Sequence, residues 1–359
     1  MDPPPSRAHQ KSDAVDLLVV MEDSTNMSDA SSPAMETGAS IAPDTTAREQ
    51  YISHSETESL IAGLKAYIYE NGRRYHAFRA GRYPFPCDES EKDRMDLWHH
   101  VHLLLNNHRY HLEPLKPHTK RILDLGTGTG IWAIEMAEQH PEIQFTGVDL
   151  APIQPEVLPQ NVTFIIADVE DPWSFTEGFD FIHCRGLGQA VRDWPKLLRQ
   201  AFKQLNPGGL MTIIDTESSC NSDDNSIPAD SALWVFQERF HEALSRIGIP
   251  DPCRYLAQYM KSAGFVDVRV VRKKIPWGPW PRNETLKQIG ACSLAMLESG
   301  FRAFGLALFT RVLGMSEDDA NALSDAAYAE CRNRNVHAFN YQWHVTGRRP
   351  EYNISAMVS

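Results

Sequence analysis

A glycine-rich turn that joins a strand to a helix constrains the fold of this chain more than any other feature. The run Arg121-Ile-Leu-Asp-Leu125 is mostly apolar, as a buried strand requires, and Gly-Thr-Gly-Thr-Gly130 follows it directly. The next residues, Ile131 to Ala137, have the composition of a helix start. Glycine tolerates positive φ and lets the backbone approach a ligand closely, and a helix start offers unpaired N–H groups. The pattern predicts a strand, loop and helix that bind a nucleotide-like ligand.

The residues of this loop separate it from loops that bind a pyrophosphate. The glycines at 126, 128 and 130 follow G-x-G-x-G, whereas the dinucleotide fingerprint is G-x-G-x-x-G. Asp124 stands two positions before the first glycine, where a carboxylate is of little use to a pyrophosphate but suits a cationic ligand. S-adenosylmethionine carries both a sulfonium and an ammonium group. The sequence therefore favours S-adenosylmethionine as the cofactor.

Acidic residues also end the next two predicted strands. Gln144–Leu150 contains Asp149, which lies about twenty residues past the glycines, where a doubly wound fold places a carboxylate against ribose hydroxyls. Val162–Asp168 ends in an acid that can accept a hydrogen bond from the adenine amine. Three acids at three strand ends serve no packing purpose. We therefore prefer a cofactor site to a doubly wound domain that binds nothing.

Four more apolar runs complete a predicted seven-stranded α/β sheet. They are Phe179–Arg185, Leu210–Asp215, Phe265–Val271 and Asn340–Thr346. Asn206-Pro-Gly-Gly209 predicts a turn before the second of these runs. Helices are expected between the strands, as in other α/β domains. The core of the protein would then comprise residues 119–275 and 338–350.

These motifs together resemble the LaeA-like branch of fungal class I S-adenosylmethionine-dependent methyltransferases. The resemblance extends from about Tyr67 to Pro350. The segments that carry it are Tyr75–Tyr83, Glu91–Asp96, Ile122–Glu135, Gly147–Pro155, Asp193–Leu197 and Val336–Asn340. It implies a Rossmann-like seven-stranded sheet with N-terminal helices, whose sixth and seventh strands pair antiparallel at one edge.

The resemblance also implies which residues contact the cofactor. They are Asp124, Gly126, Thr127, Gly128, Gly130, Asp149 and Asp168. Thr127 is a departure from the pattern, because many methyltransferases have Cys at that position. We expect little consequence, because this residue should face the interior of the loop.

Family membership leaves the function open, because function depends on the site rather than on the fold. Our first hypothesis is an enzyme of secondary metabolism that methylates a small molecule at O, N or C. The second is a LaeA-type regulator in a nuclear assembly with a velvet-type protein. A scaffold that binds the cofactor without turnover is a third, weaker alternative. The first hypothesis predicts a cytoplasmic protein, and the second a nuclear one.

Composition argues against several other classes of protein. A net charge of −12 is unsuited to holding nucleic acid through its phosphates, and the basic run Arg272-Lys-Lys274 is short. The six cysteines form no C-x-x-C pair, so neither a zinc site nor a disulfide framework is indicated. The start of the chain lacks the regions of a signal peptide, and no apolar run of membrane-spanning length is apparent. We expect a soluble intracellular protein without a metal.

The chain before the sheet divides into two parts. Residues 1–55 are rich in Ser, Asp, Pro and Thr. Such a composition buries too little apolar surface to offset the conformational entropy lost on folding, so we expect a disordered tail. Residues 56–118 are predicted to be helical, because Leu60, Leu64 and Tyr67 share a helical spacing.

An aromatic and basic stretch within that second part is a candidate component of the site. In many methyltransferases an N-terminal segment lies over the cofactor. Tyr75, His76, Arg79 and Tyr83 are therefore candidates to bind the cofactor carboxylate or to wall the substrate pocket. The alternative is a packed helix and loop whose arginines pair with Glu89, Glu91 and Asp93.

The insert between the sixth and seventh strands, residues 276–337, is predicted to be helical. Glu284–Phe309 is rich in Ala, Leu and Phe, and Ser316 with the acids behind it is typical of the start of a helix over Ser316–Asn333. The apolar face of the first helix exceeds what a surface helix needs. We interpret the insert as a lid or wall of the substrate pocket. An edge cover or a dimer surface is the alternative.

Candidates for a general base are histidines. Methyl transfer from a sulfonium mainly requires positioning, and a base is needed only if the acceptor holds its proton at neutral pH. His183 is the best-placed candidate, because it lies near the end of a predicted strand and ligands lie beyond the carboxyl ends of parallel strands. A structural role for His183 is the alternative. His99, His100 and His102 are further candidates.

Overall fold

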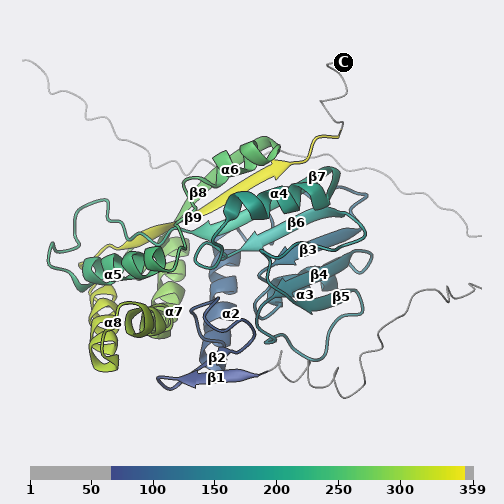
Figure 1. The fold of residues 1–359 in the computed structure, drawn as a ribbon. Helices are drawn as coiled ribbons and strands as arrows, with labels where there is room; N and C mark the ends of the chain where they lie inside the picture. The colour runs from purple at the N-terminus through teal and green to yellow at the C-terminus, as the bar shows by residue number, and fades with distance from the viewer. Residues whose placement is uncertain (1–65, 352–359) are drawn as a thin grey trace, which may run out of the picture. The chain divides into compact units, whose positions relative to one another are not determined.

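The computed structural model describes residues 66–351, and the account below concerns these residues only (Figure 1). The predicted tail, residues 1–55, lies outside that range, as do Leu60 and Leu64. The described residues form a two-stranded sheet and a seven-stranded sheet. The seven-stranded sheet contains every strand that the sequence predicts.

The strands of the large sheet follow the order β5-β4-β3-β6-β7-β9-β8. Their bounds are β3 Arg121–Leu125, β4 Gln144–Asp149, β5 Val162–Ile166, β6 Phe179–Arg185, β7 Leu205–Thr216, β8 Val266–Pro276 and β9 Phe339–Arg348. The strands from β5 to β7 are parallel, and β9 runs antiparallel to β7 and β8. The strand order reverses between β3 and β6, where α/β sheets bind their ligands. The predicted sheet with an antiparallel edge pair is confirmed.

Helices cover both faces of this sheet (Figure 1). Helices α4 (Trp194–Gln204) and α6 (Leu256–Ala263) lie on one face, and α3 (Ile131–Gln139) lies on the other. Neighbouring side chains of a strand point to opposite faces. Accordingly, Leu123 packs in the core beneath α4 and α6, and Ile122 packs in the core beneath α3.

The N-terminal segment departs from the predicted helix. Its residues form a hairpin of β1 (Tyr67–Glu70) and β2 (Arg73–His76), so the helical prediction was wrong at Tyr67. Asn71 and Gly72 make the two-residue turn with φ of 49° and 68°. Asn-Gly favours this turn because both positions need positive φ. That local signal outweighs the helical spacing of three apolar residues.

A helical layer lies beside the sheet at its β8–β9 side (Figure 1). It consists of α2 (Glu89–Leu105), α5 (Ala232–Arg246), α7 (Glu284–Ala307), a π-helical turn η1 (Leu308–Val312) and α8 (Glu317–Cys331). Helix α7 packs against α2, α5 and α8. Their facing side chains form one apolar core that is rich in phenylalanine.

One helix among residues 66–351 is long and apolar enough to cross a membrane, judged by length and composition. It is α7 continued through η1, Glu284–Val312, with a mean hydropathy of 1.3 over its most apolar window. The expectation that no apolar run reaches membrane-spanning length was therefore wrong for this helix. Within the fold, 61% of that window is buried. The helices packed around it give it the surroundings of a core helix.

Candidate functional site

The loop after β3 is held in a conformation that suits glycine. Gly126, Gly128 and Gly130 have φ of 67°, 59° and 81°, which residues with a side chain rarely adopt. A Cβ on Gly126 would lie 2.5 Å from Leu187, and one on Gly130 would overlap Phe164. A Cβ on Gly128 would meet a single sulfur atom at 3.5 Å. The loop therefore packs tightly at its two ends and leaves room for a Cβ at its middle.

Asp124 lies beneath this loop and is hydrogen-bonded on both carboxylate oxygens. It is 3% exposed. Thr127 donates its hydroxyl to one oxygen over 2.6 Å, and Nδ1 of His183 lies 2.7 Å from the other. Thr127 is itself buried and points into the loop. Asp124 thus connects the loop to β6.

Asp149 binds the same loop from the end of β4. Its carboxylate accepts the N–H of Gly128 over 2.8 Å and the N–H of Ala151 over 2.9 Å. Burial raises the pKa of Asp149, and these two backbone hydrogen bonds oppose that rise. A carboxylate offers about four acceptor positions. Positions therefore remain for two hydroxyl donors, as the ribose of a cofactor presents.

Asp168, beyond the end of β5, pairs with two arginines of the N-terminal segment. Arg82 Nε lies 2.9 Å and Arg79 Nη1 3.2 Å from the same oxygen of Asp168. The Arg82 side chain is 13% exposed and also pairs with Glu170, whereas Arg79 is 43% exposed and also pairs with Asp171. These ion pairs pin the segment before α2 to the edge of the sheet.

The structure does not bring Tyr75 and Arg79 into the site. Tyr75 is buried in the hairpin, where the Arg311 guanidinium lies 4.4 Å from the centre of its ring. Arg79 does not line the cavity, but it pairs with Asp168, which does. Arg82 is the arginine of this segment that lines the cavity. Tyr83, another candidate from the sequence, also lines the cavity. Binding of the cofactor by this segment stays a prediction.

His183 is buried in a stack. Its ring lies 3.7 Å from the ring of Trp132 at an interplanar angle of 8°, and its Nδ1 is bonded to Asp124. Burial lowers the pKa of His183, although the neighbouring carboxylate opposes this, so the ring is neutral near pH 7. Within residues 66–351, its Nε2 atom has no hydrogen-bond partner. The assignment of His183 as a general base stays a prediction.

The other candidate histidines lie outside the cavity lining. His99 bonds Arg185 over 3.0 Å, and His102 stacks on His344 with 5.6 Å between ring centres. Burial lowers the pKa of all three of these histidines, to about 3 for His99 and His344. His100 is exposed. The buried histidines therefore belong to a neutral polar core behind the site.

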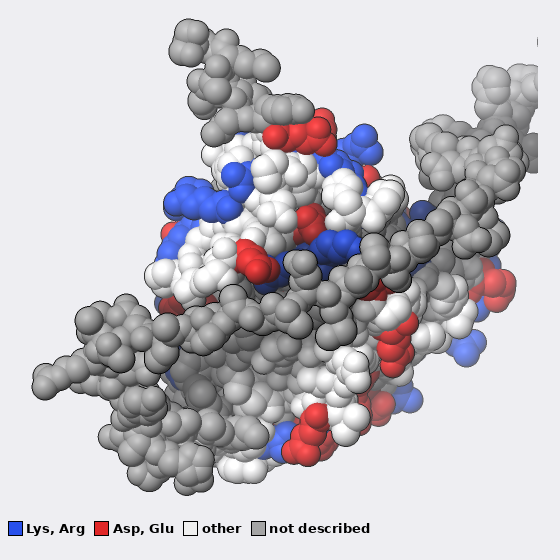
Figure 2. All heavy atoms as spheres, turned by 90° about the vertical axis from the view of Figure 1, so that its right-hand side faces the viewer, with Lys and Arg blue, Asp and Glu red and all other residues white. Residues whose placement is uncertain are grey.

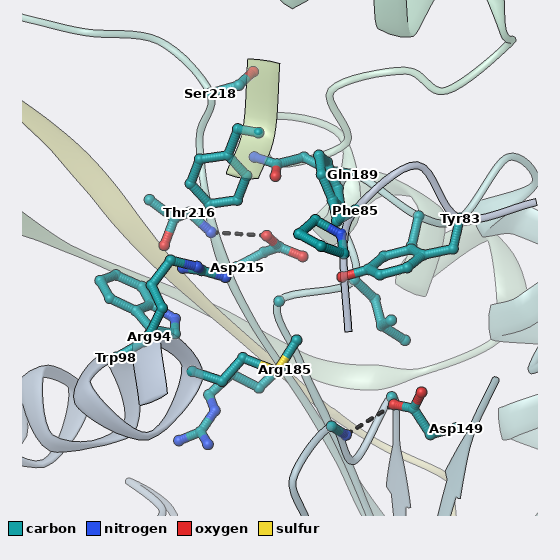
Figure 3. Close-up of a pocket in the computed structure, with 18 of the residues that line it drawn as sticks. Tyr83, Phe85, Arg94, Trp98, Asp149, Arg185, Gln189, Asp215, Thr216 and Ser218 are labelled. Atoms are coloured by element: carbon teal, nitrogen blue, oxygen red, sulfur yellow. Dashed lines mark hydrogen bonds between the residues drawn. The ribbon is translucent and has the colours of Figure 1, made fainter. Parts of the chain in front are cut away.

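A cavity of about 260 Å³ opens at the carboxyl ends of β3, β4, β6 and β7. One set of its lining residues comes from the ends of the strands and the loops that follow them: Asp124, Gly126, Thr127, Gly128, Asp149 and Asp168. A second set is apolar and comes from the helical layer and the segment before it: Phe85, Trp98, Phe236, Phe240, Met296 and Phe301. Figure 3 shows Asp149 at one side of this space and Ser218 at another. Gly130 is set back from the lining, against Phe164.

Helix α7 supplies part of the apolar wall. Ser293, Met296, Leu297, Phe301 and Phe304 line the cavity from this helix. The predicted insert is therefore in contact with the space beside the glycine loop. Its opening and closing as a lid stays a prediction.

Three cavity residues were missed as site residues by the reasoning from sequence. Asp215 ends β7, just as Asp149 ends β4, so the signal of a strand-end acid was present but was not applied there. Arg94 and Trp98 enter the cavity from α2 (Figure 3). Arg94 lies in the Glu91–Asp96 segment that carries the family resemblance, but no role was predicted for it, and Trp98 lies outside that segment. The packing of α2 against α7 sets the direction of both side chains.

The described surface carries charges of both signs. Figure 2 shows Lys and Arg interspersed with Asp and Glu on the part of this face that residues 66–351 form. Within the same residues, no group of three or more His, Cys, Asp or Glu side chains is placed to hold a metal ion.

The lining of the cavity fits S-adenosylmethionine. The loop presents open space in front of Gly128, and the first N–H groups of α3 have no side-chain cap. Asp124 and Asp149 offer negative charge beside that space. This arrangement matches a cationic nucleoside, and the sheet order matches class I methyltransferases. The fold and site together define an S-adenosylmethionine-dependent methyltransferase.

Comparisons with known proteins give the family. A family model described as a methyltransferase domain matches residues 97–270. The methyltransferase PytC of Aspergillus terreus is 39% identical, over 79% of this chain and 88% of the relative. The secondary metabolism regulator LAE1 of Cochliobolus heterostrophus is 36% identical, over 79% of this chain and 94% of the relative. The chain belongs to this family of fungal methyltransferases and LaeA-type regulators.

A further relative and a solved structure extend this picture. LaeA of Emericella nidulans, named a protein-methionine methyltransferase, is 31% identical over 96% of this chain and 91% of the relative. A structure of phosphoethanolamine N-methyltransferase 2 from Haemonchus contortus, with S-adenosylhomocysteine, aligns with 84% of this chain and 75% of its own. That alignment has 16% identity and a TM-score of 0.46.

Proposed function

We propose that this methyltransferase transfers a methyl group to a small-molecule acceptor of fungal secondary metabolism. The observation that carries the proposal is the cavity, in which an acidic loop region continues into an apolar space. The apolar part is walled by aromatic side chains of α5 and α7, including Phe236 and Phe301. A concave, mostly apolar space with a few polar groups is typical of a small-molecule site.

The cofactor's sulfonium supplies an activated methyl group, and residues of this chain hold the two reactants in place. Asp149 is positioned to bind ribose hydroxyls, and the Gly126–Gly130 loop allows close backbone approach. Asp168 is the expected partner of the adenine amine, beside Arg82. The aromatic wall excludes water and orients the acceptor. Such positioning supplies most of what this reaction needs.

A second candidate function is regulation, and the relatives named LaeA or LAE1 favour it. This chain aligns with LaeA of Emericella nidulans over 96% of its length, a share that includes residues before the methyltransferase fold. On this hypothesis the protein acts in the nucleus beside a velvet-type partner and methylates a protein or no free metabolite. On the first hypothesis it acts in the cytoplasm.

Metabolite profiling separates the two functions. A strain that lacks the gene is compared with one that carries Gly128→Asp, which fills the open space before the loop. Asp tolerates positive φ better than most residues do, so the variant protein should fold. One product lighter by a methyl group in both strains supports the enzyme. Loss of many unrelated metabolites together with their transcripts supports the regulator.

Location provides an independent test of the same alternatives. A fluorescent fusion that complements the deletion should lie in the cytoplasm if the enzyme hypothesis holds. Nuclear accumulation together with co-purification of a velvet-type protein would contradict that hypothesis.

A further inference from the structure

Asp215 is an acid of the cavity that the cofactor does not require. It lies at the end of β7, two strands away from the glycine loop after β3. The side chain is 4% exposed and lines the cavity. Figure 3 shows its carboxyl group among the labelled residues, between Thr216 and the side chains of Tyr83 and Phe85.

Backbone groups hold the Asp215 carboxylate in a fixed direction. One oxygen accepts the N–H of Gly188, and the other accepts the N–H of Thr216 over 2.8 Å. A Cβ on residue 188 would lie 2.8 Å from the carboxyl carbon, so glycine is needed for this close approach. Neither bond comes from a basic side chain. Each oxygen therefore keeps acceptor capacity for a donor in the cavity.

The surroundings of Asp215 make it a better proton acceptor than an ordinary carboxylate. Burial raises its pKa to about 7, and the nearby charge of Asp251 acts in the same direction. The thiols of Cys184 on β6 and Cys253 before α6 also face it, and their own pKa values are raised, so they stay neutral.

Other charged groups line the same cavity, among them Glu217, Arg94 and Arg185. Arg185 bonds His99 over 3.0 Å. Glu217 follows on the chain and accepts from Trp343. Arg94 enters from α2 and is paired with Glu91. Arg94 thus carries its own counter-ion, and no side-chain ion pair joins it to Asp215 among residues 66–351.

The wall around this acid is aromatic. Phe85 contacts Phe240 and Phe304 with ring centres 6.5 Å and 5.4 Å apart, and Phe236 contacts Phe301 at 4.8 Å. All five rings line the cavity. Aromatic side chains pack best against flat apolar rings. Asp215 offers a buried carboxylate beside these rings. A matching ligand therefore has a flat apolar body and a hydroxyl that can donate to this carboxylate.

We infer that the acceptor is a planar aromatic molecule with a phenol-type hydroxyl and that Asp215 is the catalytic base which takes its proton. This inference rests on the proposed methyl transfer to a small molecule. The acceptor oxygen forms a bond to the methyl carbon while the carbon–sulfur bond breaks, and that electron pair stays on sulfur. The hydroxyl proton passes to the Asp215 carboxylate and later to water, so charge and atoms balance.

The position of His183 distinguishes it from Asp215 in this role. The Nδ1 of His183 is already bonded to Asp124, and its ring face is covered by Trp132. Asp215 has no comparable side-chain partner among the described residues. A base with a pKa near the working pH combines the right protonation state with a useful driving force.

The test uses binding of two probes to the full-length protein saturated with S-adenosylhomocysteine. The first probe is 2-naphthol, and the second is naphthalene, which lacks the hydroxyl. A hydrogen bond to a charged acceptor is roughly twice as strong as one to a neutral acceptor. Wild type should bind 2-naphthol about tenfold more tightly at about pH 8.5 than at about pH 5.5. Naphthalene should bind equally at both pH values.

Two variants assign the pH dependence. Asp215→Asn should abolish it and leave the affinity for 2-naphthol at the level of wild type at low pH. Asp251→Asn, a control outside the cavity lining, should keep the dependence and move its midpoint to lower pH, because a like charge is removed. If Asp215→Asn does not fold, the midpoint shift in Asp251→Asn decides, because the charge of Asp251 acts on Asp215. An unmoved midpoint would then overturn the role of Asp215.

Each other result contradicts a defined part of the inference. A pH dependence that persists in Asp215→Asn overturns the role of Asp215, as does its absence in wild type. Equal binding of both probes at every pH overturns the hydroxyl-bearing class of acceptor. Binding of S-adenosylhomocysteine without either probe overturns the aromatic acceptor. A folded protein that binds no S-adenosylhomocysteine contradicts the proposed function itself.

Discussion

The Nδ1 atom of His183 lies 2.7 Å from a carboxylate oxygen of Asp124, and both side chains are buried. Their strands, β6 and β3, are neighbours in the sheet, and the two residues occupy the same register position. The contact ties the glycine loop to the floor of the cavity through Thr127, which bonds the other oxygen of Asp124. The geometry of the cofactor site therefore depends on a histidine that comes 59 residues later in the chain.

Loss of the His183 side chain should destabilise the fold. His183→Ala leaves an oxygen of Asp124 unpartnered in the core and removes the stack on Trp132. We expect the free energy of unfolding to fall by about 2–4 kcal/mol, as measured by urea denaturation. His100→Ala, at an exposed position of α2, is the control and should change little. An unchanged unfolding midpoint for His183→Ala would contradict a structural role.

Acid should destabilise the protein through its buried histidines. The folded-state pKa values of His99 and His344 lie near 3, below the unfolded value of about 6.5. The unfolded chain therefore binds more protons between these values. Proton uptake by these histidines favours unfolding below about pH 6.5 and has no effect on stability above it. The free energy of unfolding should fall as the pH drops from about 7 to about 5.

Histidine variants can assign this acid effect. His344→Gln should make the free energy of unfolding less dependent on pH in that range. The variant lacks a buried histidine that is neutral in the folded state and takes up a proton on unfolding. His100→Gln should leave the slope as it is in wild type, since His100 is exposed. A slope that His344→Gln does not alter would show that other groups cause the acid sensitivity.

Asp149→Ala should weaken binding of S-adenosylmethionine. The carboxylate at the end of β4 would lose two ribose hydrogen bonds to a charged acceptor, and the Gly128 N–H would lose its partner. We expect a loss of about 1–3 kcal/mol in binding free energy, measured by calorimetry. Asp171→Ala removes an exposed acid from the same edge and should bind as wild type does. Wild-type affinity in Asp149→Ala would refute the assignment.

Arg82 should matter more than Arg79 for ordering the segment that leads into α2. Arg82 is largely buried and joins Asp168 and Glu170, whereas Arg79 is partly exposed. Arg82→Gln should therefore speed proteolytic cleavage near Tyr83, and Arg79→Gln should have a smaller effect. Burying an ion pair makes the loss of one partner costly. Equal cleavage rates in the two variants would contradict this ranking.

Short sequence patterns were sufficient to predict the sheet and to name candidate cofactor residues. Strand, glycine loop and strand-end acid are local patterns, so β3, β4 and their acids could be identified from short segments. The hairpin at Tyr67–His76 was missed although its Asn-Gly signal was local, because the helical spacing was given more weight.

The aromatic part of the cavity arises from tertiary packing. Phe85, Phe236 and Phe301 lie far apart in sequence and meet because α5 and α7 share one apolar core. An amphipathic pattern shows that a helix buries one face, but it does not show which partner covers that face. The directions of side chains close together in sequence also depend on packing, since Arg82 lines the cavity and Arg79 does not. The partner of each helix and the direction of each side chain follow from packing between segments far apart in the sequence. A short segment therefore does not reveal them.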